Sequence, residues 1–173
     1  MSSLDLSRQP YMDLPQFTWF KSQGIPASFL VEMAMTVRVV HGVCTPDGWL
    51  DLDPDGRSFI TFEQDNDCVF WCPATGELTT WHHRAFALGE DNIVNAGTYA
   101  LDGYLTIYRD PLEWLRDEGR GIVILDWSRA FDMLRDAPRI LCAEQILPLY
   151  KKHMTPRHLP ELAVLTTPRR IAA

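Results

Sequence analysis

The chain has 173 residues, of which 46% are hydrophobic and 23% charged, and its formal net charge is −7. This composition is typical of a globular protein, and it excludes disorder, a collagen-like repeat and a disulfide scaffold as descriptions of the whole chain. The length fits one domain of ordinary size, so we expect residues 1–173 to form a single domain that needs no disulfide or metal to fold.

The charge is unevenly distributed along the sequence. Residues 1–100 hold 5 basic and 13 acidic side chains, whereas residues 137–173 carry a net charge of +4. The overall negative charge disfavours a general affinity for nucleic acid. The basic end could still meet a polyanion, and in that case Lys151, Lys152 and Arg157 are the predicted nucleic-acid-binding residues. The alternative is an ordinary soluble terminus with scattered surface charges.

The sequence shows no targeting or membrane segment. Residues 1–14 contain Asp5 and Asp13 and lack the apolar run of a signal peptide. No stretch approaches the roughly 20 apolar residues of a membrane span. Four cysteines without an export signal are expected to stay reduced, so we expect a cytoplasmic protein that does not contact a membrane.

Residues 1–35 are predicted to form a pair of short helices. Asp13 is a suitable N-cap, Pro15 falls in the first turn, and Gly24 can adopt the left-handed conformation that ends a helix. The second helix has an apolar stripe and a single charged residue, Glu32. It offers no side chain that reads base edges, so the pattern favours core packing over a DNA-binding helix-turn-helix.

Residues 36–108 change to the alternation of period two that is typical of strands. Turn sequences such as Pro-Asp-Gly separate the apolar runs, which favours an antiparallel β-meander. The predicted strands are residues 36–41, 49–52, 58–63, 68–72, 77–81 and 104–108.

Residues 109–166 alternate between helix-like and strand-like runs. This spacing favours a small α/β layer of short parallel strands with right-handed crossovers, so the predicted fold class is α+β, and residues 167–173 are assigned to a tail. The predicted helices are 111–116, 127–135 and 143–153, and the predicted strands are 121–125, 139–142 and 162–165.

Alternate carboxylates at Asp51, Asp53 and Asp55, followed by Gly56, have the spacing of a calcium-binding loop. The twelfth loop position, which requires a glutamate, is Phe62, and the flanking segments resemble strands. A hairpin with a Pro-Asp-Gly turn explains the same residues without a metal, and we favour it.

Two cysteines and two histidines raise the question of a zinc site. Cys68 and Cys72 lie on one predicted strand, where their side chains would stand about 13 Å apart, and His82 and His83 follow ten residues later. One ion cannot bridge that distance. We therefore favour buried thiols and predict no metal site.

Aromatic residues on the predicted strands could stack nucleic-acid bases, but the acidic residues around them oppose this function. Core packing of the aromatic residues is favoured. An acidic sheet could also bind a basic protein surface or mimic nucleic acid. The acidic residues of this region are Asp47, Asp51, Asp53, Asp55, Glu63, Asp65 and Asp67.

The strand-like run at residues 122–125 is followed by Asp126. In nucleotide hydrolases a similar strand is followed by a carboxylate that binds magnesium. The sequence has no Gly-Lys dipeptide, so the usual phosphate-binding loop is missing. An N-cap function for Asp126 explains the residue without a ligand.

Two segments resemble plasmid and phage primase-type proteins. Residues 19–26 (Trp-Phe-Lys-Ser-Gln-Gly-Ile-Pro) are similar to the short helix and Gly-Ile turn that precede the Toprim domain of these proteins. Residues 139–153 with the strand at 162–165 resemble the first strand, glutamate, helix and second strand of Toprim itself. Further runs resemble small uncharacterised proteins of bacterial plasmids and prophages: residues 84–90, 111–115 and 121–124.

The resemblance implies an acid/base or metal-binding function for Glu144, and magnesium-binding aspartates later in the chain. In the enzyme alternative below, Asp126 is the second candidate catalytic residue. Gln145 replaces the usual glycine, and no Asp-x-Asp follows. We therefore expect a non-catalytic accessory protein of a plasmid or prophage that needs no cofactor. It would act through protein or nucleic-acid contacts near DNA replication or processing. The alternative is a truncated Toprim-like, magnesium-dependent nucleic-acid enzyme. The sequence leaves the partner and the oligomeric state open.

Overall fold

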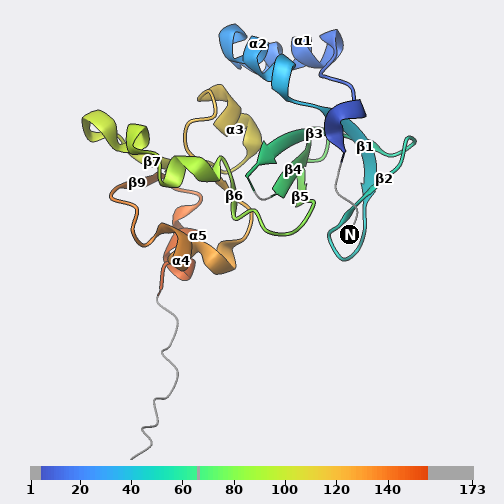
Figure 1. Cartoon of the computed structure of the whole chain (residues 1–173). Helices are drawn as coiled ribbons and strands as arrows, with labels where there is room; N and C mark the ends of the chain where they lie inside the picture. The colour runs from blue at the N-terminus through green and yellow to red at the C-terminus, as the bar shows by residue number, and fades with distance from the viewer. Residues whose placement is uncertain (1–4, 66, 156–173) are drawn as a thin grey trace, which may run out of the picture.

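The computed structural model describes residues 5–65 and 67–155, which form an α+β fold (Figure 1). A pair of helices leads into a five-stranded antiparallel sheet, and a layer of short strands and helices follows. The predicted fold class is confirmed. The predicted strand at 162–165 and the tail at 167–173 lie outside the described residues.

The first half of the chain contains two helices and the main sheet. Its elements are η1 (Leu6–Arg8), α1 (Leu14–Ser22), α2 (Ala27–Thr36), β1 (Val39–Cys44), β2 (Leu50–Leu52), β3 (Arg57–Gln64), β4 (Asp67–Cys72) and β5 (Glu77–Thr80). The first strand begins later than predicted because α2 continues through Thr36.

The second half contains shorter elements. They are β6 (Ala87–Leu88), η2 (Glu90–Ile93), η3 (Ala96–Asp102), β7 (Leu105–Ile107), α3 (Pro111–Arg116), β8 (Val123–Ile124), η4 (Trp127–Arg129), α4 (Ala130–Leu134), β9 (Ile140–Cys142) and α5 (Leu147–His153).

The predicted caps form at both ends of α1. The carboxylate of Asp13 accepts the N–H of Gln16 at 2.8 Å, and the Gln16 side chain accepts the N–H of Asp13 at 2.9 Å. This reciprocal pair is a capping box, which satisfies backbone donors that the first helical turn leaves free. Gly24 then turns the chain with a φ of +87°. Helices α1 and α2 consequently lie side by side above the sheet (Figure 1).

The strand order of the main sheet is β2-β1-β3-β4-β5, so β1 lies between β2 and β3. Gly42 of β1 is paired with Leu52 on one side and with Arg57 on the other. The turn from Asp53 to Gly56 forms as predicted, with the Gly56 N–H donated to the Asp53 carbonyl at 2.9 Å. It crosses β1 and does not join paired strands. The predicted hairpin at this place is therefore wrong, because β2 and β3 each pair with β1.

The crossing requires two glycines in contact. A Cβ atom on Gly56 would lie 2.4 Å from the carbonyl oxygen of Gly42, and a Cβ on Gly42 would lie 2.6 Å from the carbonyl oxygen of Asp51. Real Cβ atoms do not approach backbone atoms so closely. The missing side chains are what allow the chain to pass over β1.

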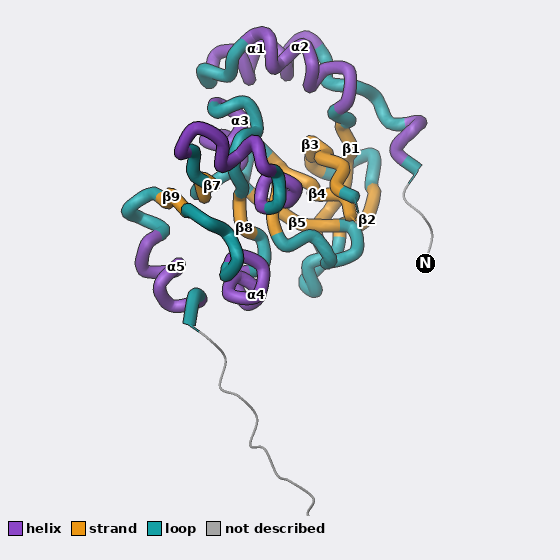
Figure 2. Tube along the Cα trace, turned by 60° about the vertical axis from the view of Figure 1, so that its left-hand side comes forward, coloured by secondary structure: helices purple, strands orange, loops and turns teal. Residues whose placement is uncertain are grey.

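The main sheet is rolled, so that the turn between β1 and β2 reaches β5. The Thr79 hydroxyl donates to the Gly48 carbonyl, and the Trp49 ring stands edge-on to the His83 ring with centroids 4.2 Å apart. Figure 2 shows β1, β2 and β5 curving around the same space. An apolar cluster fills the roll: Leu6, Val40, Leu50, Phe59, Cys68, Phe70 and Cys72.

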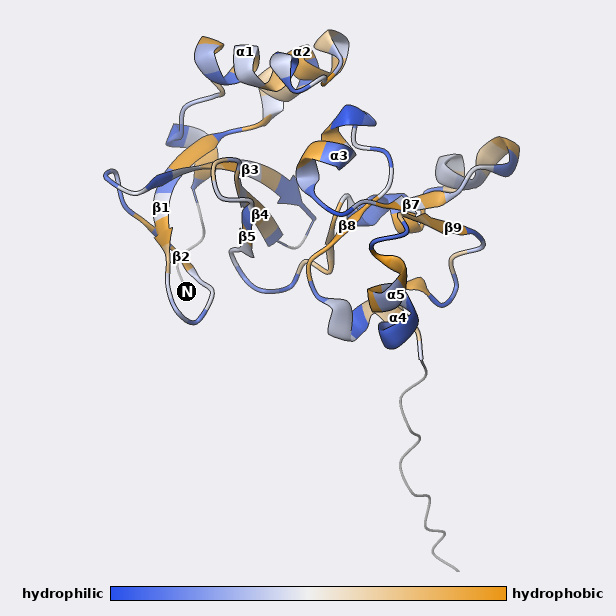
Figure 3. Ribbon diagram, turned by 180° about the vertical axis from the view of Figure 1, so that it is seen from behind, coloured by the Kyte–Doolittle hydropathy of each residue, from blue (hydrophilic) through white to orange (hydrophobic). Residues whose placement is uncertain are grey.

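The opposite face of the sheet packs against helices α1, α2 and α3. This second apolar cluster includes Leu30 of α2, Ile60 of β3, Leu115 of α3 and Val123 of β8. All six residues of β4 are buried because both faces of this interior strand are covered. Figure 3 shows apolar residues along the strands that pack against these helices.

The second half contains the predicted short parallel strands. β7 is paired in parallel with β9, β6 is antiparallel to β8, and a parallel bridge joins Ile107 to Ile122. β7 therefore lies between β8 and β9. A third apolar cluster, which includes Phe86, Ile107 and Leu134, packs against these strands. Within the described ranges, every helix is too short or too polar to cross a membrane.

Candidate functional site

Two adjoining hollows, of about 640 and 650 Å³, lie where the main sheet meets the second half of the chain. They share Gln64, Asp65, Asp67 and Arg84, which separate them. The two hollows together are lined by six carboxylates and by three arginines, Arg38, Arg84 and Arg129, which gives a formal excess of three negative charges. We call the pair the acidic trough and define it by its carboxylates: Glu63, Asp65, Asp67, Glu90, Asp91 and Asp132.

Asp67 forms the wall between the two hollows. Its carboxylate accepts four backbone N–H groups, from Cys68 at 2.8 Å, His82 at 2.7 Å, Arg84 at 2.7 Å and Ala85 at 3.0 Å. Burial acts to raise the pKa of this carboxyl, but these four hydrogen bonds outweigh it and hold the pKa below its ordinary value. Asp67 is therefore an ionised structural group that fixes the chain after β5 against β4.

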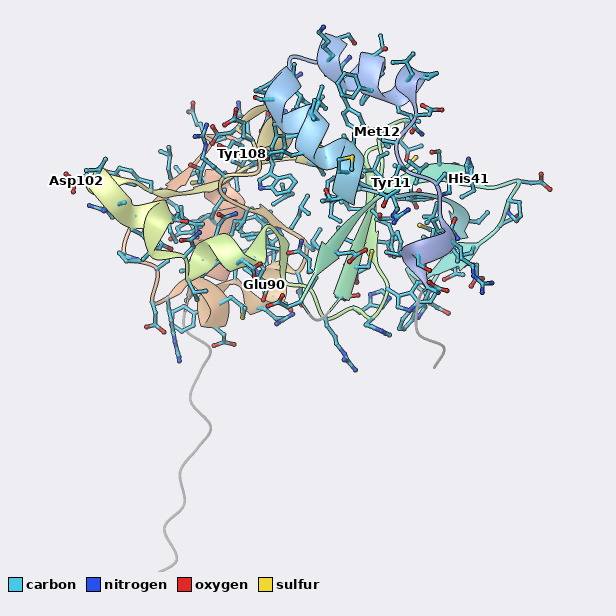
Figure 4. All side chains as sticks on the ribbon, turned by 45° about the horizontal axis from the view of Figure 1, so that its top comes forward. Tyr11, Met12, His41, Glu90, Asp102 and Tyr108 are labelled. Carbon is cyan, nitrogen blue, oxygen red and sulfur yellow. The ribbon has the colours of Figure 1, made fainter. Side chains whose placement is uncertain are left out.

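Further hydrogen bonds hold the η2 side of the trough in place. The Glu90 carboxylate accepts the N–H of Phe86 at 2.8 Å, at the junction between η2 and the sheet (Figure 4). The Asn92 amide donates to the carbonyls of Gly119 at 3.0 Å and Gly121 at 2.9 Å. These bonds connect η2 to the loop between α3 and β8.

Two of the arginines in the trough bind neighbouring groups of the protein. Arg129 donates to the Arg84 carbonyl at 2.7 Å, and its guanidinium lies 5.9 Å from the centre of the Phe86 ring. Arg38 donates to the Tyr11 hydroxyl at 2.7 Å and stacks 3.5 Å from the centre of the Tyr11 ring. These cations are therefore engaged with neighbouring groups.

Four carboxylates of the trough remain without a hydrogen-bond or ion-pair partner among the described residues. They come from β3, the turn after it, η2 and α4: Glu63, Asp65, Asp91 and Asp132. Ala85 and Met133 contribute apolar surface to the hollow that Asp65, Asp91 and Asp132 line. The trough can therefore hold an elongated cationic ligand with apolar stems, such as lysine or arginine side chains.

The two carboxylates of the predicted enzyme site follow strands that are not neighbours. Asp126 follows β8 and caps η4, accepting the N–H of Ser128 at 3.0 Å and its hydroxyl at 2.6 Å. Glu144 is exposed and follows β9, and β7 separates the two strands by two strand spacings, about 10 Å. Asp126 lines a hollow of about 370 Å³ with His83 and Thr80, and Glu144 does not line it.

The predicted nucleic-acid-binding lysines lie on the last turn of α5. Lys151 and Lys152 are both exposed there, and the neighbouring His153 ring lies 6.0 Å from the ring of Trp127. Helix α5 contacts α4 and η4. Arg157, the third predicted residue, lies outside the described residues.

The residues considered as metal ligands remain apart. In residues 5–65 and 67–155, no group of three or more histidine, cysteine, aspartate or glutamate side chains could hold a metal ion. Cys68 and Cys72 are buried, which confirms their interpretation as core thiols. Burial, followed by the charges of Glu63 and Asp67, raises the pKa of the Cys68 thiol to about 12.

The trough was not predicted from the sequence. Its acidic residues at 63–67 are close together in the chain and were identified as an acidic region, but Glu90, Asp91 and Asp132 are distant from them. Only the packing of η2 and α4 beside the β3–β4 turn brings them together.

Comparisons of the chain with known protein families, curated proteins and solved structures found no match. The likeness to primase-type and mobile-element proteins therefore rests on the short segments quoted above. The trough's geometry carries the functional argument.

Proposed function

We propose that the protein is a non-catalytic accessory protein that binds a lysine- or arginine-rich segment of a protein partner in the acidic trough. The observation that carries this proposal is a set of four carboxylates without partners among the described residues, which β3, the turn after it, η2 and α4 present to the two adjoining hollows of the trough. A cytoplasmic function near DNA replication or processing in a plasmid or prophage is part of the same proposal.

Electrostatics predicts how such a segment would bind. An exposed ion pair contributes only about 0.2–1 kcal/mol, so several pairs are needed for measurable affinity. Because these carboxylates are exposed, salt should screen each pair and weaken the complex. Contact of the apolar stems of lysine or arginine with Ala85 and Met133 would add a hydrophobic contribution to the binding affinity, which salt does not remove.

The test is fluorescence anisotropy with a labelled peptide of alternating lysine and leucine, at low and raised salt. The double variant Asp91→Lys with Asp132→Lys should weaken binding by roughly tenfold or more, because it replaces attraction with repulsion. A second double variant, Asp47→Lys with Asp55→Lys, makes the same charge change at exposed turn positions outside the trough. It should leave binding within about twofold. Equal weakening by both double variants would assign the effect to net charge and refute the proposal.

Nucleic-acid contact through α5 is a second candidate function. What favours it is the exposure of Lys151 and Lys152 together on one turn, in a region whose sequence is basic. Retention on immobilised DNA should then fall with salt, and Lys151→Glu with Lys152→Glu should reduce the logarithmic salt slope by about 1–2. Retention that this double variant leaves unchanged would remove the candidate.

The alternative of a Toprim-like enzyme requires Glu144 and Asp126 to share a magnesium ion. The intervening strand β7 gives this alternative less support than the trough gives to binding. Magnesium titration followed by calorimetry distinguishes them. A binding signal that Glu144→Gln and Asp126→Asn each abolish, and that Glu118→Gln preserves, would favour the enzyme.

A further inference from the structure

We propose that the outer face of α2 is a self-association surface that binds a second copy of this chain. The inner face of α2 is apolar, since Leu30 and Met33 are buried against the sheet. The exposed side carries an apolar stripe as well, beside the polar residues Ser28, Glu32 and Thr36: Val31 is 59% exposed and Met35 is 72% exposed. These two residues are four apart and therefore lie on one stripe of the helix.

An apolar stripe on both sides of a helix is typical of a helix that is covered on both sides. The inner side of α2 packs against the sheet cluster. The outer stripe continues to Ala27, one turn earlier, whose small exposed side chain leaves room for a neighbouring helix. We call Ala27, Val31 and Met35 the α2 stripe.

The charges of the helical pair indicate what covers this stripe. Residues 14–36 contain only two charged side chains, Lys21 and Glu32, so this segment is neutral in a chain of net charge −7. Neither of the two has an ion-pair partner among the described residues. Two acidic molecules repel each other over most of their surface, and this face lets them meet without net repulsion.

A second copy also fits the chemistry better than the basic partner proposed for the trough. A basic segment would gain no ion pair from a neutral apolar stripe. A symmetric contact instead places one α2 stripe against the other, because a two-fold interface uses the same patch on both molecules.

The experiment measures molecular mass by sedimentation and by light scattering, over about 1–100 µM of the full chain. The unmodified protein should form a dimer as concentration rises. Val31→Glu and Met35→Glu should each raise the dimer dissociation constant about tenfold or more, because they place a carboxylate in the contact. Glutamate is a good helix former, so both variants should keep the unmodified melting temperature within a few degrees.

Val94→Glu is the matched control, since Val94 is 85% exposed, lies outside α2, and the substitution adds the same charge. It should leave dimerisation unchanged. A protein that stays monomeric up to the highest concentration would overturn the inference, as would equal effects of all three variants. Monomers that bind phosphatidylcholine vesicles through Val31 and Met35 would overturn it too, and would assign the stripe to a lipid surface.

Salt separates this inference from the proposed function. Raised salt should leave the dimer unchanged or strengthen it, because it screens the repulsion between two acidic molecules. The same change should weaken peptide binding in the trough. A dimer that salt dissociates would contradict an apolar contact at α2, whatever the peptide does.

Discussion

Asp67 is the residue on which the geometry of the acidic trough depends most. Its buried carboxylate holds four N–H groups from two separate segments, β4 and the chain after β5. Hydrogen bonds to an ionised acceptor are stronger than neutral ones, and donors left without an acceptor inside a protein are costly.

We predict that Asp67→Ala lowers the free energy of unfolding by about 3–5 kcal/mol, because four donors then lose their acceptor. Urea unfolding followed by circular dichroism measures the change. Asp65→Ala changes an exposed side chain two residues away that has no partner among the described residues, and it should change the stability by less than about 0.5 kcal/mol. Similar losses in both variants would contradict the structural importance of Asp67.

The pKa of Asp67 also predicts how stability depends on pH. The folded protein holds this pKa below its ordinary value, so the unfolded chain binds the proton more readily. The stabilisation is therefore complete above the ordinary aspartate pKa of about 4, and it is lost as the pH falls through the lower folded value. Urea midpoints measured between about pH 6 and pH 3 should fall less steeply in Asp67→Asn than in the unmodified protein. Parallel curves would refute this assignment.

At the scale of elements, the crossing of the chain over β1 decides the strand order. Gly42 and Gly56 lie in backbone contact there, and both neighbouring strands pair with Gly42. The turn chemistry of Asp53–Gly56 is local and was predictable from the sequence. Which strands the turn connects depends on pairing between distant residues.

We predict that Gly56→Ala destabilises the protein by about 2–4 kcal/mol, because its Cβ would meet backbone atoms that cannot move aside by changing rotamer. Gly97→Ala is the control, since its Cβ would meet only the side chain of Asn95, with Oδ1 at 3.1 Å and Cγ at 3.8 Å, and no backbone atom. It should cost less than about 1 kcal/mol. Thermal unfolding of both variants gives the comparison, and equal losses would contradict the close crossing.

At the scale of the whole molecule, one apolar cluster contains residues from the helical pair, the main sheet and the second half of the chain. Trp114 of α3 stands edge-on to Phe62 of β3 with ring centroids 5.6 Å apart, and its N–H donates to the Gly121 carbonyl at 3.0 Å. Contacts of this kind favour joint unfolding of the two halves, as expected for a single domain.

We predict that the chain unfolds in one cooperative transition, and that Trp114→Ala lowers the stability by about 3–5 kcal/mol. Far-UV circular dichroism and the fluorescence of the remaining tryptophans should shift together in urea. Two separate transitions, or a shift in only one of the signals, would indicate two independently folding units.

The local features of this protein follow from the sequence alone. The capping box of Asp13 and Gln16, the left-handed Gly24 and the N-cap at Asp126 each depend on residues at most a few positions apart. The antiparallel sheet and the short parallel strands were predictable because side-chain alternation and element spacing reflect burial and crossover length.

Tertiary packing alone decided the position of β1 between β2 and β3, and it alone assembled the acidic trough. Strand order depends on pairing across the chain and on contact between Gly42 and Gly56, which no local pattern encodes. The trough forms from carboxylates up to 69 residues apart, Glu63 to Asp132, that converge only when η2 and α4 pack beside the sheet. The separation of Glu144 from Asp126 has the same origin, because it depends on which strand lies between them.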